Sequence, residues 1–78
     1  MGYNGWKNRE TWNCMLRINA DEPLYRAAVD FMRSYKGRKP YRDFVEATLE
    51  SPATPDGISW LSRKLDYRAL NAAMRELN

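Results

Sequence analysis

The stretch of sequence that decides the fold is NGWKNRETWN, residues 4–13. Two tryptophans, Trp6 and Trp12, bracket five polar residues, three of which are charged. An ordinary amphipathic helix has no need of such a run, because its apolar residues recur at steps of three and four. We therefore interpret the stretch as a junction, in which Trp6 anchors the chain before a helix and Trp12 docks inside that helix.

The residues around this junction place the start of the helix. Two glycines precede it and disfavour helix, which predicts an extended N-terminal arm over residues 1–7. Asn8 is a favourable N-cap, and Glu10 follows in the first turn, where the helix dipole favours a carboxylate. Apolar residues at helical spacing then predict a helix over residues 9–18.

The rest of the chain repeats this combination of a capping residue and apolar residues at helical spacing. Three aspartates are candidate N-caps, namely Asp21, Asp56 and Asp66. The pattern predicts further helices over residues 22–35, 40–49, 57–64 and 67–77. No segment alternates apolar and polar residues for long enough to predict a strand. The sequence thus predicts an all-α, compact single domain over residues 1–78, with four or five short helices.

The same spacing predicts the core and the end of one helix. Residues that share helical periodicity across four segments are expected to be buried together, namely Trp12, Phe31, Phe44, Leu70 and Met74. Large rings dominate this set because they bury the most area per residue. Gly37 follows the second predicted helix and is expected to be its C-terminal stop.

Composition argues against several classes of function. The chain has 78 residues, a net charge of +3, one cysteine and no histidine. Without histidine it cannot form a Ser-His-Asp or Cys-His arrangement, so we expect no catalytic residues, no metal ligands and no cofactor. The lone Cys14 cannot form an internal disulfide, which favours a cytoplasmic protein. No apolar stretch approaches the roughly 20 residues of a membrane span, so we expect no membrane partner.

The first candidate interaction surface lies on the first predicted helix. Arg9, Asn13 and Arg17 are spaced four apart and are expected to share a face, with Trp6 close by in sequence. Tryptophan and arginine are enriched at protein–protein hot spots, and two guanidinium groups beside an amide also suit a phosphate or a base edge. The alternative is structural: Trp6 folds back over the helix, and the polar residues form a solvated face or satisfy the arm.

The second candidate is the densest positive stretch, KGRKPYR, which we call the basic segment (residues 36–42). Tyr41 offers a ring for stacking, and the four cations are Lys36, Arg38, Lys39 and Arg42. This is the best site in the chain for a phosphate backbone or an acidic protein surface. The alternative is a solubilising loop near a helix C-terminus. A weaker basic group consists of Arg63, Lys64 and Arg68. If it lies close to the basic segment in space, the case for a nucleic-acid partner improves sharply.

Residues 3–13, YNGWKNRETWN, resemble a family of small proteins of unknown function that is associated with bacteriophages, cyanobacteria and other bacteria. The similarity continues through residues 21–25 and 65–71, and so covers most of the chain. The resemblance supplies no activity and no catalytic residues. It implies a small accessory protein of a phage or mobile element, a class of protein that often binds a host macromolecule.

These observations lead to two functional hypotheses. The first is a non-enzymatic interaction protein, a monomer or weak homodimer, that binds and modulates an unidentified host protein through its aromatic and arginine surface. The alternative is a nucleic-acid-binding domain that uses the basic segment. No helix of the sequence is dense in base-reading side chains, so the pattern does not predict a helix-turn-helix reader of duplex DNA.

Overall fold

The computed structural model describes residues 5–77 and confirms the all-α prediction. The described chain forms four helices, which are α1 (Arg9–Ala20), α2 (Glu22–Ser34), α3 (Pro40–Thr48) and α4 (Tyr67–Arg75). Residues 5–77 contain no strand, and an isolated bridge joins Ala53 to Ser59. Most of the predicted arm, residues 1–4, lies outside the described residues.

Three of the predicted N-caps are confirmed, and this is why the helices begin where the sequence places them. Asn8 accepts a hydrogen bond from the backbone N–H of Thr11 at the start of α1. Asp21 and Asp66 do the same for α2 and α4. Each side-chain oxygen satisfies one backbone donor that the first turn of a helix leaves unpaired.

The helix predicted over residues 57–64 is wrong, because turn chemistry outweighs the apolar spacing there. Asp56 caps nothing; it lies in a tight turn in which the N–H of Gly57 donates to the carbonyl of Thr54 at 2.8 Å. Gly57 has a φ of 86°, a conformation that glycine adopts without strain. With Pro55 at the second position, the turn suits the sequence better than a helical start does. Residues 49–66 therefore form one long loop between α3 and α4.

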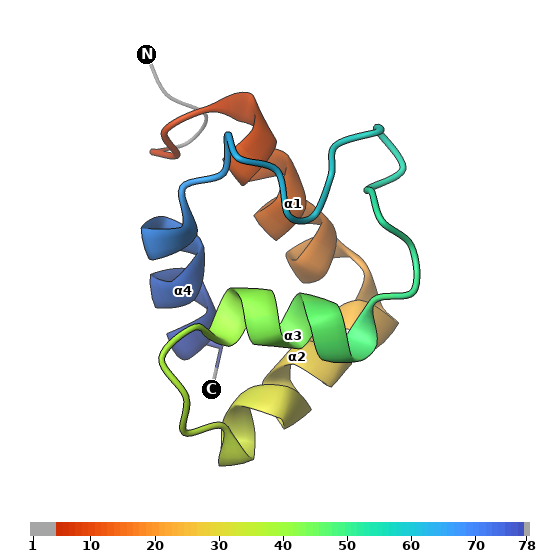
Figure 1. The fold of residues 1–78 in the computed structure, drawn as a ribbon. Helices are drawn as coiled ribbons and strands as arrows, with labels where there is room; N and C mark the ends of the chain where they lie inside the picture. Colours follow the sequence, from red (N-terminus) through yellow and green to blue (C-terminus); the bar gives the residue numbers. More distant parts are fainter. Residues whose placement is uncertain (1–4, 78) are drawn as a thin grey trace.

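The four helices pack around one core, and the loop closes it (Figure 1). Helix α1 packs against α2 and α4, and α3 packs against α2 and α4. The loop leaves the end of α3, passes beside α1 and returns the chain to the start of α4 (Figure 1). It contributes Ile58, Trp60 and Leu65 to the core, so these residues replace the helix that the sequence predicts there.

The predicted core is confirmed in part. Phe44, Leu70 and Met74 are fully buried. Trp12 and Phe31 are half-buried and not fully buried, and Phe31 packs against the core. Their place is taken by smaller residues of α1, among them Met15 and Ile18, and by the loop tryptophan Trp60. Gly37 is not the helix stop, because α2 ends at Ser34 with Tyr35 as its C-cap.

Candidate functional site

The structure does not assemble the first candidate surface. Trp6 is half-buried and packs against the core, whereas Arg9 is exposed. Asn13 is 1% exposed, so it is not part of a solvated face with Arg9 and Arg17. Arg17 is half-buried and lines a separate pocket described below. The prediction that Asn13 is an accessible contact residue is therefore wrong.

The neutral polar residues of this stretch instead hold the loop between α3 and α4. The side-chain amide of Asn8 donates to the carbonyl of Lys64 at 2.7 Å, and the hydroxyl of Thr11 accepts from the N–H of Asp66 at 2.9 Å. The amide of Asn13 donates to the carboxylate of Asp56 at 2.6 Å. We call Asn8, Thr11 and Asn13 the polar clamp. It joins the N-terminal half of α1 to three points along the loop.

The basic segment leaves its four cations exposed while its backbone is pinned. The hydroxyl of Tyr35 accepts from the N–H of Lys39 at 3.0 Å and donates to the carboxylate of Asp43. Gly37 lies so close to Tyr35 that a Cβ at this position would collide with the hydroxyl. A further bond runs from the guanidinium of Arg75 to the carbonyl of Arg38 at 3.3 Å.

Tyr41, like Pro40 before it, is a member of the basic segment that the structure removes from the surface. Its side chain is fully buried, and its hydroxyl donates to the carbonyl of Trp60 at 2.8 Å. Burial raises the pKa of this hydroxyl well above its ordinary value. The prediction that Tyr41 offers a ring for stacking is therefore wrong.

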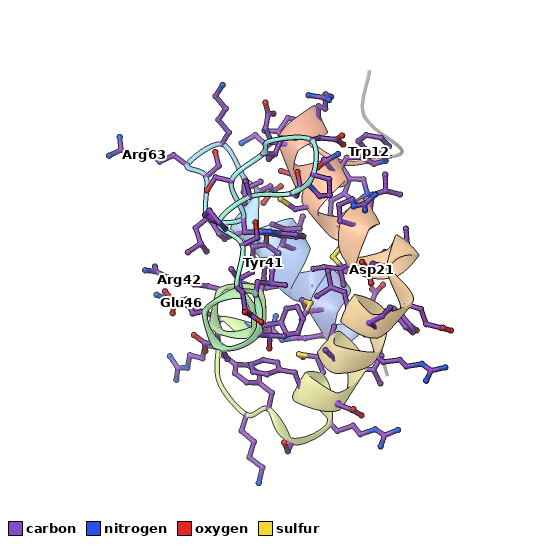
Figure 2. All side chains as sticks on the ribbon, turned by 90° about the vertical axis from the view of Figure 1, so that its right-hand side faces the viewer. Trp12, Asp21, Tyr41, Arg42, Glu46 and Arg63 are labelled. Carbon is purple, nitrogen blue, oxygen red and sulfur yellow. The ribbon has the colours of Figure 1, made fainter. Side chains whose placement is uncertain are left out.

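Two parts of the basic sequence pattern do converge. A pocket of about 410 Å³ is lined by Lys39, Arg42, Leu61, Arg63, Tyr67 and Asn71, which we call the basic pocket. Arg42 and Arg63 lie on the same side of the molecule, opposite Trp12, while Tyr41 lies inside (Figure 2). Lys36 and Arg38 do not line the pocket, nor do the other two members of the weaker group, Lys64 and Arg68.

The charge lining the basic pocket is entirely positive. Lys39, Arg42 and Arg63 supply three cations, and no acid is among the lining residues. The Nε of Arg42 pairs with Glu46 at 3.4 Å, but both side chains are more than half exposed. Such surface pairs contribute about 0–1 kcal/mol, so an anion of higher charge can replace Glu46. Within the described chain, the terminal nitrogens of Arg42 have no hydrogen-bond partner.

An apolar and rigid surface lies among these cations. Tyr67 donates its hydroxyl proton to the carbonyl of Ser62 at 2.8 Å, and its ring packs against that of Tyr41 at 6.0 Å. Burial raises the pKa of Tyr67, and the positive charge of Arg42 opposes that shift. Leu61 is 40% exposed, one of the large apolar residues that the described chain leaves most accessible.

Sequence reasoning missed the residues that make this a pocket. Leu61 comes from the loop, and Tyr67 and Asn71 come from α4, so only tertiary structure brings them to the basic segment. One signal was present: Tyr67 and Asn71 are four apart and lie beside the apolar stripe of α4 rather than in it. Asn71 also accepts from the N–H of Tyr41 at 3.0 Å, which caps α3 from outside.

A second pocket, of about 530 Å³, lies where the α1–α2 turn meets the loop. Arg17 and Asp21 supply charge on one side, and Glu50 on the other. The lining between them includes Leu24 and the edge of Trp60, which is only 4% exposed. The charge of this pocket is mixed, so it has no preference for one sign of ligand.

Three observations bear on catalysis, metal binding and membrane insertion. Within residues 5–77, no three histidine, cysteine, aspartate or glutamate side chains gather as metal ligands would. Burial raises the pKa of the Cys14 thiol, which disfavours the reactive thiolate. None of the helices described is long and apolar enough to cross a membrane.

Comparison with known proteins identifies the family and nothing further. The chain belongs to a family of unknown function, DUF7249, whose model matches residues 1–78. Searches of curated proteins and of solved structures find no match.

Proposed function

We propose that this protein is a non-enzymatic binding protein that holds the phosphate groups of a nucleic acid at the basic pocket. The observation that carries the proposal is the convergence of Arg63 with Lys39 and Arg42 around one hollow. The sequence alone ranks a host protein first, and convergence of the two basic groups strengthens the case for nucleic acid; Arg63 is the member of the weaker group that converges. Because Asn13 belongs to the polar clamp, the competing aromatic and arginine surface has lost one of its members.

Charge and geometry support phosphate as the ligand. Guanidinium groups present several N–H donors in a fixed fork that matches phosphate oxygens. The three cations come from the first turn of α3 and from the loop, and both are anchored by hydrogen bonds to the rest of the fold. A backbone that is already held in place lowers the entropic cost of binding. The net charge of +3 predicts modest affinity and strong dependence on salt.

A host protein is the second candidate, and one observation favours it. The pocket at the α1–α2 turn combines Arg17 with apolar lining, as protein interfaces often do. In this second function the protein acts as an accessory protein of a phage or mobile element that modulates a host factor. The basic segment then serves only solubility.

A salt titration of labelled DNA and RNA by fluorescence anisotropy tests the first function. We expect a double variant, Lys39→Ala with Arg63→Ala, to weaken binding. The slope of the log binding constant against log salt concentration should become less steep by the share of two phosphate contacts, each of which contributes about 0.7–0.9. The matched control is Arg26→Ala with Arg33→Ala. These arginines are about three-quarters exposed on α2, and their loss changes the net charge equally.

Equal effects of the two double variants would show that only net charge matters and would contradict a defined site. A pull-down from host lysate, with and without nuclease, separates the two functions. A partner that survives nuclease treatment and is lost on Arg17→Ala would favour the host protein.

A further inference from the structure

We infer that the basic pocket takes an unpaired nucleobase together with the phosphates beside it, so that the ligand is single-stranded. This inference rests on the proposed function and adds the form of the nucleic acid. Its starting point is that phosphate binding alone leaves part of the pocket unexplained. Leu61 is 40% exposed between cationic residues, where a site for phosphate alone needs no apolar side chain.

The Tyr67 ring gives the pocket a fixed aromatic surface. Its hydroxyl is tied to the carbonyl of Ser62 at 2.8 Å, and the buried ring of Tyr41 lies 6.0 Å behind it. A ring that is already held loses little freedom when a base packs on it. Aromatic side chains next to a positively charged groove are the usual means by which proteins bind unpaired bases.

Asn71 adds a donor whose direction is already set. Its Oδ1 accepts from the N–H of Tyr41 at 3.0 Å, which fixes the orientation of the amide. The Nδ2 has no partner among the described residues, although Asn71 lines the pocket. This amide can donate to a base carbonyl or ring nitrogen, or to a phosphate oxygen, without rearranging.

The size of the pocket agrees with a ligand that has both a planar apolar part and negative charge. At about 410 Å³ it falls within the roughly 300–1,000 Å³ of small-molecule sites. A base inside a duplex is stacked and paired, and extruding it costs a few kcal/mol. A protein with three cations in its pocket has little binding free energy to offset that cost. The geometry therefore favours strands whose bases are already unpaired.

The test compares three probes with wild-type protein: a labelled single strand of about eight nucleotides, its duplex, and an abasic strand of equal charge. We expect the single strand to bind at least about fivefold more tightly than the other two, as loss of one stacked base would predict. We also expect Leu61→Ala and Tyr67→Leu to remove most of that difference. The control is Leu16→Ala, because Leu16 is 39% exposed on α1 and lines none of the pockets described.

Tyr67→Leu can disturb the fold, so a second measurement keeps the inference testable in the wild-type protein. The side-chain amide resonances of Asn71 should shift on addition of the single strand, and much less with the abasic strand. Equal binding of all three probes, lost in the Lys39→Ala and Arg63→Ala double variant, would overturn the inference and keep the proposed function. No binding of any probe would overturn both, as would displacement by an acidic peptide as effective as the strand.

Discussion

The polar clamp and the basic segment are both polar stretches that include the start of a helix, yet the side chains of one face inward and the cations of the other face outward. Thr11 and Asn13 are almost completely buried, whereas Lys36, Arg38 and Lys39 are exposed. Thr11 and Asn13 can be buried because the loop supplies partners, which are the N–H of Asp66 for the Thr11 hydroxyl and the carboxylate of Asp56 for the amide nitrogen of Asn13. Among residues 5–77 no charged side chain is buried, so the cations of the basic segment find no buried partner of opposite charge there.

The comparison teaches that whether a polar side chain is neutral or charged predicts whether it points into the protein or into solvent. The clamp residues connect α1 to a loop that has no regular structure of its own, so their loss should reduce stability. The side chains of the cations in the basic segment make only one contact of this kind, the surface pair of Arg42 with Glu46, whereas the backbone at Lys39 and Arg38 is held by hydrogen bonds. Their loss should reduce binding and leave stability almost unchanged. Four variants test this division.

The largest effect is expected from Asn13→Asp. It places a carboxylate in a site that is 1% exposed and 2.6 Å from the carboxylate of Asp56. We expect a loss of about 3 kcal/mol in the free energy of unfolding near neutral pH, measured by urea denaturation. Because burial and Asp56 raise the pKa of the new carboxyl in the folded state, the loss should shrink as the pH is lowered. Adding Asp56→Asn should restore stability, and a variant that stays as stable as wild type would show that Asn13 is not buried.

A smaller loss is expected from Thr11→Val, which keeps the shape of the side chain and removes its hydroxyl. That hydroxyl donates to Asn8 at 2.6 Å and accepts from the N–H of Asp66 at 2.9 Å. The substitution leaves the Asp66 donor unsatisfied, at a cost of about 2 kcal/mol. Thr48→Val is the control, because Thr48 is exposed at the end of α3. Equal melting temperatures for the two variants would contradict the clamp.

Tyr41 belongs to the basic segment in sequence and to the core in structure. The dependence of stability on alkaline pH tests its burial in the core. Burial raises the pKa of its hydroxyl in the folded state, whereas the unfolded chain ionises near the ordinary value of 10.0. The folded state therefore retains a proton that the unfolded state loses, and stability should fall as the pH rises above about 10.

Thermal melts between pH 8 and 11 measure this effect. Tyr41→Phe should lower stability by about 1 kcal/mol at pH 8, through loss of the bond to Trp60, and should make the alkaline decline less steep. The same slope in both proteins would place the responsible group elsewhere, for instance at Tyr35 or Tyr67, whose pKa values are also raised.

The smallest effect is expected from Lys36→Ala with Arg38→Ala. Both side chains are exposed and neither lines the basic pocket, so the free energy of unfolding should change by less than about 0.5 kcal/mol. Affinity for a single strand should fall less than it does in the Lys39→Ala and Arg63→Ala variant. If it falls as much or more, binding extends over the whole basic segment and is not centred on the pocket.

Local signals explain what the sequence predicts well. Asn8, Asp21 and Asp66 act through backbone groups only a few residues away, so the starts of three helices follow from the sequence directly. The inward direction of Asn13 depends on Asp56, which lies 43 residues along the chain. No pattern within α1 reveals that contact.

The candidate site is less predictable than the fold for the same reason. The cations of the basic segment are visible in the sequence, but the pocket needs Leu61, Tyr67 and Asn71. Leu61 reaches the basic segment because the loop is held against α1 and α3, and Tyr67 and Asn71 reach it because α4 packs against α3. The tight turn at Gly57 also replaces a predicted helix. Pro55, Asp56 and Gly57 are a local turn signal, and here that signal outweighs the apolar periodicity.

The separation of the clamp partners along the chain has a kinetic consequence. The hydrogen bond of Asn8 spans 56 positions along the chain, and that of Thr11 spans 55. These two bonds therefore close the longest loops among the side-chain hydrogen bonds of residues 5–77. Closing a long loop early costs more entropy than forming local turns, so α1 and α2 should pair before the clamp forms. We expect clamp variants to speed unfolding and to leave the refolding rate nearly unchanged, which makes opening of the loop the first step by which the native protein comes apart.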